Sequence, residues 1–167
     1  MEPIENKVAA SGLITIDFEE WVNIHPYTAI DLSPVLFQGL VMREADLKEW
    51  LKNYDYLAVK GQNLIFQCPD DIILQKWVPL LVFSRFAPYA AHMTWGNTDD
   101  LFNDLLQKAI LAYDISQLQG ARIVLKGCSK YAVKPATYSL AVDKFQPVAQ
   151  SILYGEPCST VPIYKKR

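Results

Sequence analysis

"YDYLAVKGQNLIFQC" (residues 54–68) and "YDISQLQGARIVLKGC" (residues 113–128) are two versions of one pattern, and this pattern decides the fold. Each begins with Tyr-Asp, reaches a glycine six residues after the aspartate, continues through a short apolar run and ends in a cysteine. Gly61 and Gly120 therefore stand at the same place in both versions. A glycine before an apolar, β-branched run is typical of a turn that leads into a buried strand.

A second pair of segments repeats at the same distance. "RFAPYAAHMTWG" (85–96) and "KFQPVAQSILYG" (144–155) both read basic, Phe, any residue, Pro, any residue, Ala, and end in an aromatic residue and glycine. All these matches lie 59 residues apart, and only the cysteines slip by one, because Gly127 is an extra residue in the later copy. Two copies are too few for a solenoid, so the pattern predicts an internal duplication.

Helical and strand patterns alternate within each copy. Residues 44–55 and 97–114 carry apolar residues at helical spacing, and the prolines at 88 and 147 stand where further helices should end. The stretch "PDDIILQKWVPLLVFSRF" is predicted to be a helix that opens at Asp70 and Asp71. Short apolar strands separated by helices favour parallel crossovers. We predict an α/β fold with one mainly parallel sheet of about five strands and helices on its faces, built from a duplicated αβαβ unit.

The chain is predicted to form one domain, because no flexible linker interrupts it. Residues 1–43 lie outside the repeat and contain a strand, "GLITIDF", and a short helix near Pro34. The remaining parts of this division are the first copy, the second copy and a C-terminal tail: residues 44–96, 103–155 and 156–167.

Composition narrows the function classes. The 167 residues carry a net charge of −2 with both signs mixed, which gives no electrostatic footprint for nucleic acid. The longest apolar stretch, "WVPLLVF", is far shorter than the roughly 20 residues that a membrane-spanning helix needs. Three cysteines, an odd number, and an acidic N-terminus without an apolar signal core predict a protein of the reducing cytoplasm.

All three cysteines are predicted to leave strands at one edge of the sheet. Cys68 follows "LIFQ", Cys128 follows "RIVLK" after Gly127, and Cys158 follows "SILY". Ligands of open parallel sheets bind outside the carboxyl ends of the strands. Three thiolates suit zinc or an iron–sulfur cluster, so we predict a non-catalytic accessory of iron–sulfur or sulfur metabolism that uses this edge for metal, cluster or partner contact. The sequence contains no C-x-x-C pair, and this absence counts against the metal interpretation.

Two alternatives stay open. In the first, the protein is a thiol-dependent enzyme with Cys158 or Cys128 as the nucleophile and Glu156 or His92 assisting. In the second, the cysteines are inert, packed residues of a structural or interaction module. Backbone amides and hydroxyls near the same strand ends are candidates for holding a small anion or cofactor, namely those of Gly127, Ser129, Ser159 and Thr160.

Three stretches resemble an uncharacterised bacterial family that is known only as a domain of unknown function. They are "NKVAASGLITIDFEEW" at the start, "KGCS" in the middle and "YGEPCSTVPIYKK" at the end. The resemblance runs along essentially the whole chain and supplies no catalytic residues. It implies a gene neighbourhood shared with the iron–sulfur assembly machinery of the sulfur-mobilisation type, so iron–sulfur assembly proteins are the expected partners. If so, Cys68, Cys128 and Cys158 are the residues to suspect.

Overall fold

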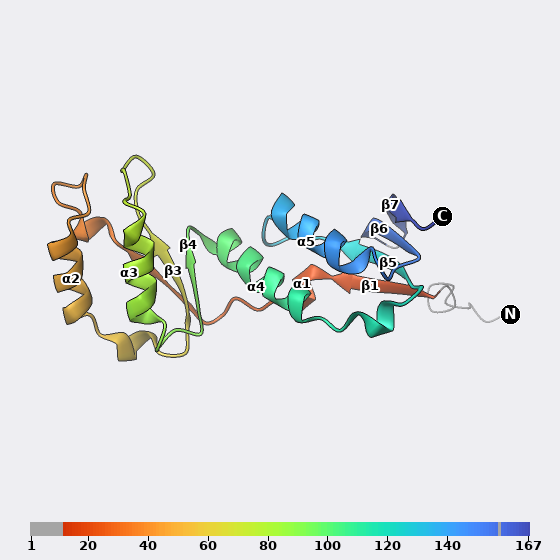
Figure 1. The fold of residues 1–167 in the computed structure, drawn as a ribbon, viewed down its shortest axis with the longest axis horizontal. Coiled ribbons are helices and arrows are strands. Elements are labelled where there is room, and N and C mark those ends of the chain that lie inside the picture. The colour runs from red at the N-terminus through yellow and green to blue at the C-terminus, as the bar shows by residue number, and fades with distance from the viewer. Residues whose placement is uncertain (1–11, 157) are drawn as a thin grey trace, which may run out of the picture. The chain divides into compact units, whose positions relative to one another are not determined.

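The structure is a computed structural model that describes residues 12–156 and 158–167. Helices and strands alternate along it, and most neighbouring strands are parallel, which confirms the predicted α/β class (Figure 1). The strands divide between a four-stranded and a three-stranded sheet instead of forming one sheet of about five. The chain contacts separate two compact units, which we call unit 1 (Met1–Asn23 with Leu105–Arg167) and unit 2 (Ile24–Asp104). The prediction of a single domain stays a prediction.

Unit 1 contains the four-stranded sheet in the order β1-β5-β6-β7, in which β7 alone is antiparallel to its neighbour. Helix α4 (Thr98–Ala112) begins in unit 2 and ends in unit 1. The other elements of unit 1 are β1 (Leu13–Asp17), α1 (Phe18–Trp21), the 3-10 helix η4 (Ile115–Leu118), β5 (Arg122–Lys126), α5 (Pro135–Phe145), β6 (Ser151–Glu156) and β7 (Ser159–Lys165).

Unit 2 contains the three-stranded sheet, in the order β2-β3-β4, with every pair parallel. Each crossover between its strands passes through a helix, as parallel pairing requires. Its elements are β2 (Tyr27–Asp31), the 3-10 helix η2 (Ser33–Val35), α2 (Glu44–Asn53), the 3-10 helix η3 (Tyr56–Val59), β3 (Asn63–Gln67), α3 (Trp77–Phe86) and β4 (His92–Trp95).

The two units repeat the same backbone contacts 59 residues apart. The N–H of Gly61 donates to the carbonyl of Tyr89 over 2.8 Å, and the N–H of Gly120 donates to the carbonyl of Val148 over the same distance. Both glycines have positive φ angles, 75° and 69°, a region that residues with a Cβ rarely adopt. Asn63 is in register with His92, and Arg122 is in register with Ser151. The glycines recur in the sequence because the same turn precedes β3 and β5.

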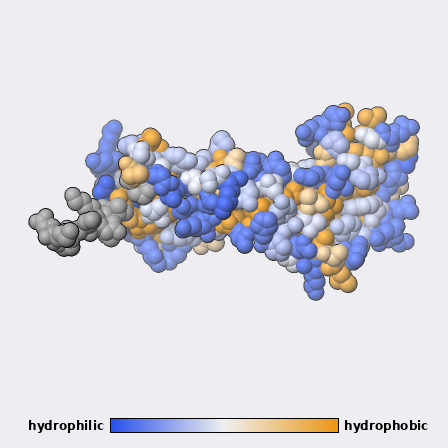
Figure 2. All heavy atoms as spheres, turned by 180° about the vertical axis from the view of Figure 1, so that it is seen from behind, coloured by the Kyte–Doolittle hydropathy of each residue, from blue (hydrophilic) through white to orange (hydrophobic). Residues whose placement is uncertain are grey.

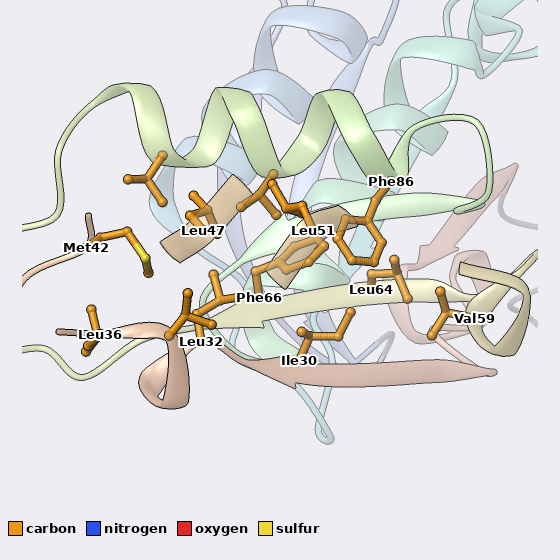
Figure 3. Packing of buried hydrophobic residues seen from close by; sticks show 13 residues of the cluster. Ile30, Leu32, Leu36, Met42, Leu47, Leu51, Val59, Leu64, Phe66 and Phe86 are labelled. Atoms are coloured by element: carbon orange, nitrogen blue, oxygen red, sulfur yellow. The ribbon is translucent and has the colours of Figure 1, made fainter. Parts of the chain in front are cut away.

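The core of unit 2 lies between its sheet and its helices. Figure 3 shows Ile30 from β2 and Leu64 and Phe66 from β3 pointing towards the helix side, where Phe86 of α3 meets them. The Phe66 and Phe86 rings are 5.0 Å apart, edge to face, and both residues are fully buried. Burying apolar surface stabilises by about 25 cal/mol per Å², so these rings are major contributors to the stability of the unit.

Helix α3 begins later than the sequence pattern predicts. Asp70 and Asp71 do not cap it, because the helix starts at Trp77. Pro79 explains the shift: in a helix starting near Asp71 it would lie in the interior, where proline removes a hydrogen bond and clashes with the preceding turn. In the observed helix Pro79 lies in the first turn, where proline is tolerated.

Two strands, β2 and β7, were not predicted. The N-terminal segment supplies one strand to each unit, β1 to unit 1 and β2 to unit 2, and residues 159–165 of the predicted tail form β7. Pro162 lies inside β7, which is compatible with an edge position in the sheet. Cys158 consequently lies in the turn of the β6–β7 hairpin.

Hydrophobic and hydrophilic residues are intermixed on the surface that Figure 2 presents. Within the described parts of the chain, no helix is both long enough and apolar enough to cross a membrane. Some large apolar side chains are nevertheless exposed on β7, where Val161 is 61% and Ile163 is 54% accessible. Of these two residues, Ile163 lines the cavity described next and Val161 does not.

Candidate functional site

Three charged residues meet at the carboxyl ends of the parallel strands of unit 1. Asp17 ends β1, Lys126 ends β5 and Glu156 ends β6. The Lys126 ammonium lies 2.7 Å from an Asp17 carboxylate oxygen and 3.5 Å from one of Glu156. The bond to Asp17 is the main reason that the pKa of Lys126 is raised. Ligands of open parallel sheets bind at this edge, so these strand ends are the place to look for function.

Glu19 ties the loop after β5 to helix α1. Its carboxylate accepts hydrogen bonds from the Ser129 backbone N–H (3.2 Å) and hydroxyl (2.9 Å) and forms an ion pair with Lys130 at 2.9 Å. Together these bonds lower the pKa of Glu19 to about 2, and the bond from Lys130 makes the largest contribution. Asp17 in turn accepts the N–H of Glu19 over 3.0 Å. The loop is thus fastened to the same strand end that holds Lys126.

Two tyrosines share a hydrogen bond beside Gly127. The hydroxyls of Tyr138 on α5 and Tyr154 on β6 are 3.0 Å apart, and their rings pack edge to face at 5.7 Å. A Cβ on Gly127 would lie 2.6 Å from the Tyr154 hydroxyl and 3.3 Å from the Tyr138 hydroxyl. The extra residue of the second copy is therefore a glycine because a hydroxyl occupies the space of its side chain. Burial, and then the bond to Tyr154, raise the pKa of Tyr138, so its hydroxyl is neutral at ordinary pH.

The rings of this pair line an apolar cavity of about 330 Å³. Four elements of unit 1 supply its walls, with Leu125 from β5, Tyr138 and Val142 from α5, Tyr154 from β6 and Ile163 from β7. The two hydroxyls are the only polar side-chain atoms that these five residues possess. The result is an apolar cavity with one hydrogen-bonding group, the usual composition of a small-molecule site.

Unit 2 fills the equivalent space with aromatic rings. Phe66, Phe83 and Trp95 stand 59 residues before Leu125, Val142 and Tyr154. Phe66 lies 5.8 Å from Phe83 and 6.4 Å from Trp95, and the last two are also 6.4 Å apart. Leucine and valine in place of two phenylalanines leave space in unit 1, and β7 adds a wall that the three-stranded sheet of unit 2 does not have. The cavity is a departure of unit 1 from the shared frame.

The three cysteines, all free thiols, are divided between the units. Cys68 belongs to unit 2, where it is half-buried against the core, and burial raises the pKa of its thiol. Cys128 and Cys158 belong to unit 1, the first half-buried after Gly127 and the second exposed in the hairpin turn. No group of three or more His, Cys, Asp or Glu side chains among the described residues is placed to hold a metal ion. The three-cysteine metal site stays a prediction.

The other predicted site residues have diverse surroundings. His92 begins β4 in unit 2, with its Nε2 atom 3.7 Å from an Asp104 carboxylate oxygen, whereas Glu156 contacts Lys126 in unit 1. In the β6–β7 hairpin, Ser159 is in register with Glu156 and Thr160 with Gly155. Ser129 binds Glu19, as described above. Of the predicted residues, Gly127 is the one that adjoins the cavity through its contact with the tyrosine pair.

Sequence reasoning missed Lys126 at the end of β5 and all the residues that line the cavity: Leu125, Tyr138, Val142, Tyr154 and Ile163. The sequence does hold a signal for two of them. Aligning the copies at the offset of 59 residues places Val142 opposite Phe83 and Tyr154 opposite Trp95, at positions that face the core in unit 2. Smaller or more polar residues at core positions of one copy indicate a cavity in that copy. Ile163 has no counterpart and could not be found in this way.

A family model for a protein of unknown function, DUF2480, matches residues 2–166. The chain therefore belongs to this uncharacterised family, as its sequence resemblance predicted. No curated protein matches it, and no solved structure does.

Proposed function

We propose that this protein binds, in unit 1, a small organic molecule with an apolar body and a neutral hydrogen-bonding head. The observation that carries the proposal is the cavity of about 330 Å³ lined by apolar side chains and the Tyr138–Tyr154 hydroxyl pair. This volume lies at the lower end of the range of ligand pockets, roughly 300–1,000 Å³. A compact molecule rather than a long chain fits it.

The hydrogen bonding of the two tyrosine hydroxyls determines which polar group of a ligand fits beside them. When one hydroxyl donates to the other, the pair keeps one O–H donor and several acceptor lone pairs. Burial and the bond to Tyr154 raise the pKa of Tyr138, so its phenolate form, which would repel a carbonyl oxygen, is disfavoured. Asp17 and Glu156 already compensate the charge of Lys126, so this cation does not call for an anionic ligand. A carbonyl or amide oxygen is the complementary head.

Hexanamide and acetamide test this proposal, because they share a neutral amide head and differ only in the apolar chain. We expect hexanamide to shift the NMR signals of the Leu125, Val142 and Ile163 methyl groups and acetamide to leave them unchanged. Val142→Phe introduces the residue that unit 2 has at the equivalent position, Phe83. The added ring should fill the cavity and abolish the hexanamide-induced shifts.

Val161→Phe is the matched control for that variant. It adds a ring of similar size on exposed β7 without entering the cavity lining, and it should preserve hexanamide binding. If hexanamide leaves the methyl signals unchanged, or binds Val142→Phe as it binds the natural protein, the proposal is wrong.

A role as an accessory of iron–sulfur or sulfur metabolism stays a second proposal. It is supported by the position of Cys68 and Cys128, which follow the equivalent strands β3 and β5. Anaerobic purification followed by metal analysis and visible absorption tests it. A colourless protein that holds neither iron nor zinc, and accepts neither on reconstitution, would contradict it. The thiol-enzyme alternative predicts that iodoacetamide reacts with Cys128 or Cys158 well below the ordinary thiol pKa of about 8.5.

We also infer that the two units arose by duplication of one β-α-β-α-β element series. The support is the set of matched turns, glycines and strand registers at the single offset of 59 residues. The first strands share a contact outside this offset, because Asp17 at the end of β1 and Asp31 at the end of β2 each accept the N–H of the residue two positions later. Divergence of the copies then explains why only unit 1 has the tyrosine-lined cavity.

A further inference from the structure

Unit 2 has a cavity of its own, of about 550 Å³, between helices α2 and α3. Lys48 and Lys52 line it from one side and Ser84 and Arg85 from the other. Tyr56 and Tyr89 complete the wall. The cavity shares no residue with the site of unit 1, so neither proposal depends on the other.

The charge of this cavity has one sign. Three of its side chains are cations, and no carboxylate is among the described residues that line it. Lys48 is 2.5 Å from a Glu44 carboxylate oxygen, whereas no carboxylate elsewhere in residues 12–156 and 158–167 forms an ion pair with Lys52 or Arg85. Lys52 and Arg85 occupy the last turns of their helices. Neither cation has a carboxylate partner among the described residues; the carbonyl ends of α2 and α3 offset part of their charge, and the remaining positive charge attracts an anion.

The tyrosines give this cavity a fixed wall. The Tyr56 and Tyr89 rings are stacked, with centroids 4.9 Å apart and planes 22° from parallel. The Tyr56 hydroxyl donates to the Leu51 carbonyl over 2.6 Å, and the Gly61 N–H holds the Tyr89 carbonyl. Burial raises the pKa of Tyr56, and the charge of Arg85, which lines the same cavity, opposes that rise. A ligand between the helices would meet a rigid aromatic surface beside the cations.

The shared frame of the two units does not require these cations. At the equivalent positions of unit 1, Gln107 and Leu111 replace Lys48 and Lys52. Lys144 is equivalent to Arg85, but its ammonium donates to the Leu111 carbonyl over 2.8 Å. The two tyrosines are replaced by isoleucine and valine. The aromatic, cationic cavity is specific to unit 2.

We propose that this cavity of unit 2 binds the phosphate group of a phosphorylated small molecule. A phosphate offers several acceptor oxygens and up to two negative charges, which match separate cations better than a single carboxylate does. The planar guanidinium of Arg85 suits such a group, because it can donate two parallel hydrogen bonds to it. A volume of about 550 Å³ exceeds what a phosphate alone fills, so the rest of the molecule lies against the tyrosine wall.

Calorimetric titration of the full chain at low salt tests the proposal with four probes. These are inorganic phosphate, ribose 5-phosphate, AMP and uncharged adenosine. We expect AMP or ribose 5-phosphate to bind at least about tenfold more tightly than either adenosine or inorganic phosphate, because only they offer both charge and an organic body. Equal binding of inorganic phosphate would overturn the assignment to an organic phosphate, and failure of both organophosphates to bind would overturn the site itself.

Variants locate the binding. Arg85→Gln and Lys52→Leu should each weaken the tighter organophosphate by about tenfold or more, since each removes a charged hydrogen-bond donor. Both side chains are exposed, so the fold should persist, which circular dichroism checks. Lys144→Gln is the matched control: it removes the same charge from the equivalent position of unit 1 and should leave the affinity unchanged. Equal weakening by Lys144→Gln and Arg85→Gln would show an effect of net charge and overturn the proposal.

Discussion

Unit 1 and unit 2 use one arrangement of strands and helices for different interiors. Unit 2 packs Phe66, Phe83 and Trp95 against one another, and it has Gln67 at the end of β3 and Asn97 beyond the end of β4 where unit 1 has Lys126 and Glu156. Unit 1 leaves a cavity instead and gathers charges at the strand ends. The comparison teaches that backbone turns and register hold the frame, while core size and strand-end charge are free to diverge.

Between the helices the difference is reversed, because here unit 2 carries the additional charged residues. Between its two helices unit 2 has two lysines, an arginine and two stacked tyrosines, and unit 1 has glutamine, leucine and a lysine bound to a carbonyl. Each unit therefore departs from its counterpart at one place, unit 1 at the sheet and unit 2 at the helices. A difference within a repeated frame is informative because the frame itself does not require it.

The largest expected effect tests whether the cores are equivalent. Phe86→Ala and Phe145→Ala remove matched, fully buried rings and should each cost about 3–5 kcal/mol in the free energy of unfolding. Phe86 should cost more, because within residues 12–156 and 158–167 its ring packs against four aromatic rings and that of Phe145 against two. Urea unfolding of both variants measures this. A larger loss for Phe145→Ala would break the comparison of the cores.

A smaller effect should follow from the extra residue of unit 1. Gly127→Ala places a Cβ against the Tyr154 hydroxyl and should cost about 1–3 kcal/mol through overpacking and loss of the tyrosine bond. Thermal unfolding measures the cost.

Tyr154→Phe supplies the control in a double-mutant cycle, because it removes the hydroxyl that the new methyl group meets. Gly127→Ala should then be clearly less destabilising in the Tyr154→Phe background than in the natural protein. An equal cost in both backgrounds would show that Gly127 is needed for another reason.

The smallest expected effect concerns Glu19, whose counterpart next to β2 is Ser33. The pKa of Glu19 is lowered from 4.5 to about 2, so its ionised form stabilises the folded state. That contribution is complete above about pH 4.5 and is lost as the pH falls towards 2. Glu19→Gln should therefore lower the melting temperature at pH 6, and the difference from the natural protein should shrink steadily below pH 4.5.

Glu20→Gln is the control for this pH dependence, since it removes the same charge from the neighbouring position of α1. A constant difference between Glu19→Gln and the natural protein from pH 6 to pH 2.5 would contradict the role of the Glu19 carboxylate. So would an equal pH-dependent effect of Glu20→Gln.

Local signals in the sequence were sufficient for most elements. The positive φ of Gly61 and Gly120 explains why these residues repeat, Pro135 marks the first residue of α5, and Asn97 caps α4 by accepting the N–H of Asp99. Elements whose identity depends on distant partners were missed. β2 is a strand because it pairs with β3, and β7 because it pairs with β6 across a hairpin. The division into two sheets is likewise a property of pairing, which no local pattern encodes.

The sequence predicts the strand edge at which the candidate site lies, but the cysteines it singles out are not among the residues that line the cavity. The strand-end rule directed attention to the residues after β5 and β6, and Gly127 and Glu156 do lie there. Cysteines are conspicuous in a sequence because their chemistry is distinctive, whereas Leu125 and Val142 are ordinary apolar residues. They matter only because a leucine and a valine leave space where the other unit has phenylalanines. Cavity formation depends on the sum of several side-chain volumes, so it became visible only when the side chains were placed together.

Unit 1 is formed by two stretches of the chain that are separated by unit 2, and this has a consequence for biosynthesis. Strand β1 is made first, but its partner β5 is made only after all of unit 2, since Leu13 pairs with Arg122. A ribosome synthesising from the N-terminus thus releases every strand of unit 2 while β1 still lacks its hydrogen-bonding neighbour. Strand β1 emerges before unit 2 but pairs only after it, so its unpaired edge must be kept from foreign strands until residue 126 has left the exit tunnel.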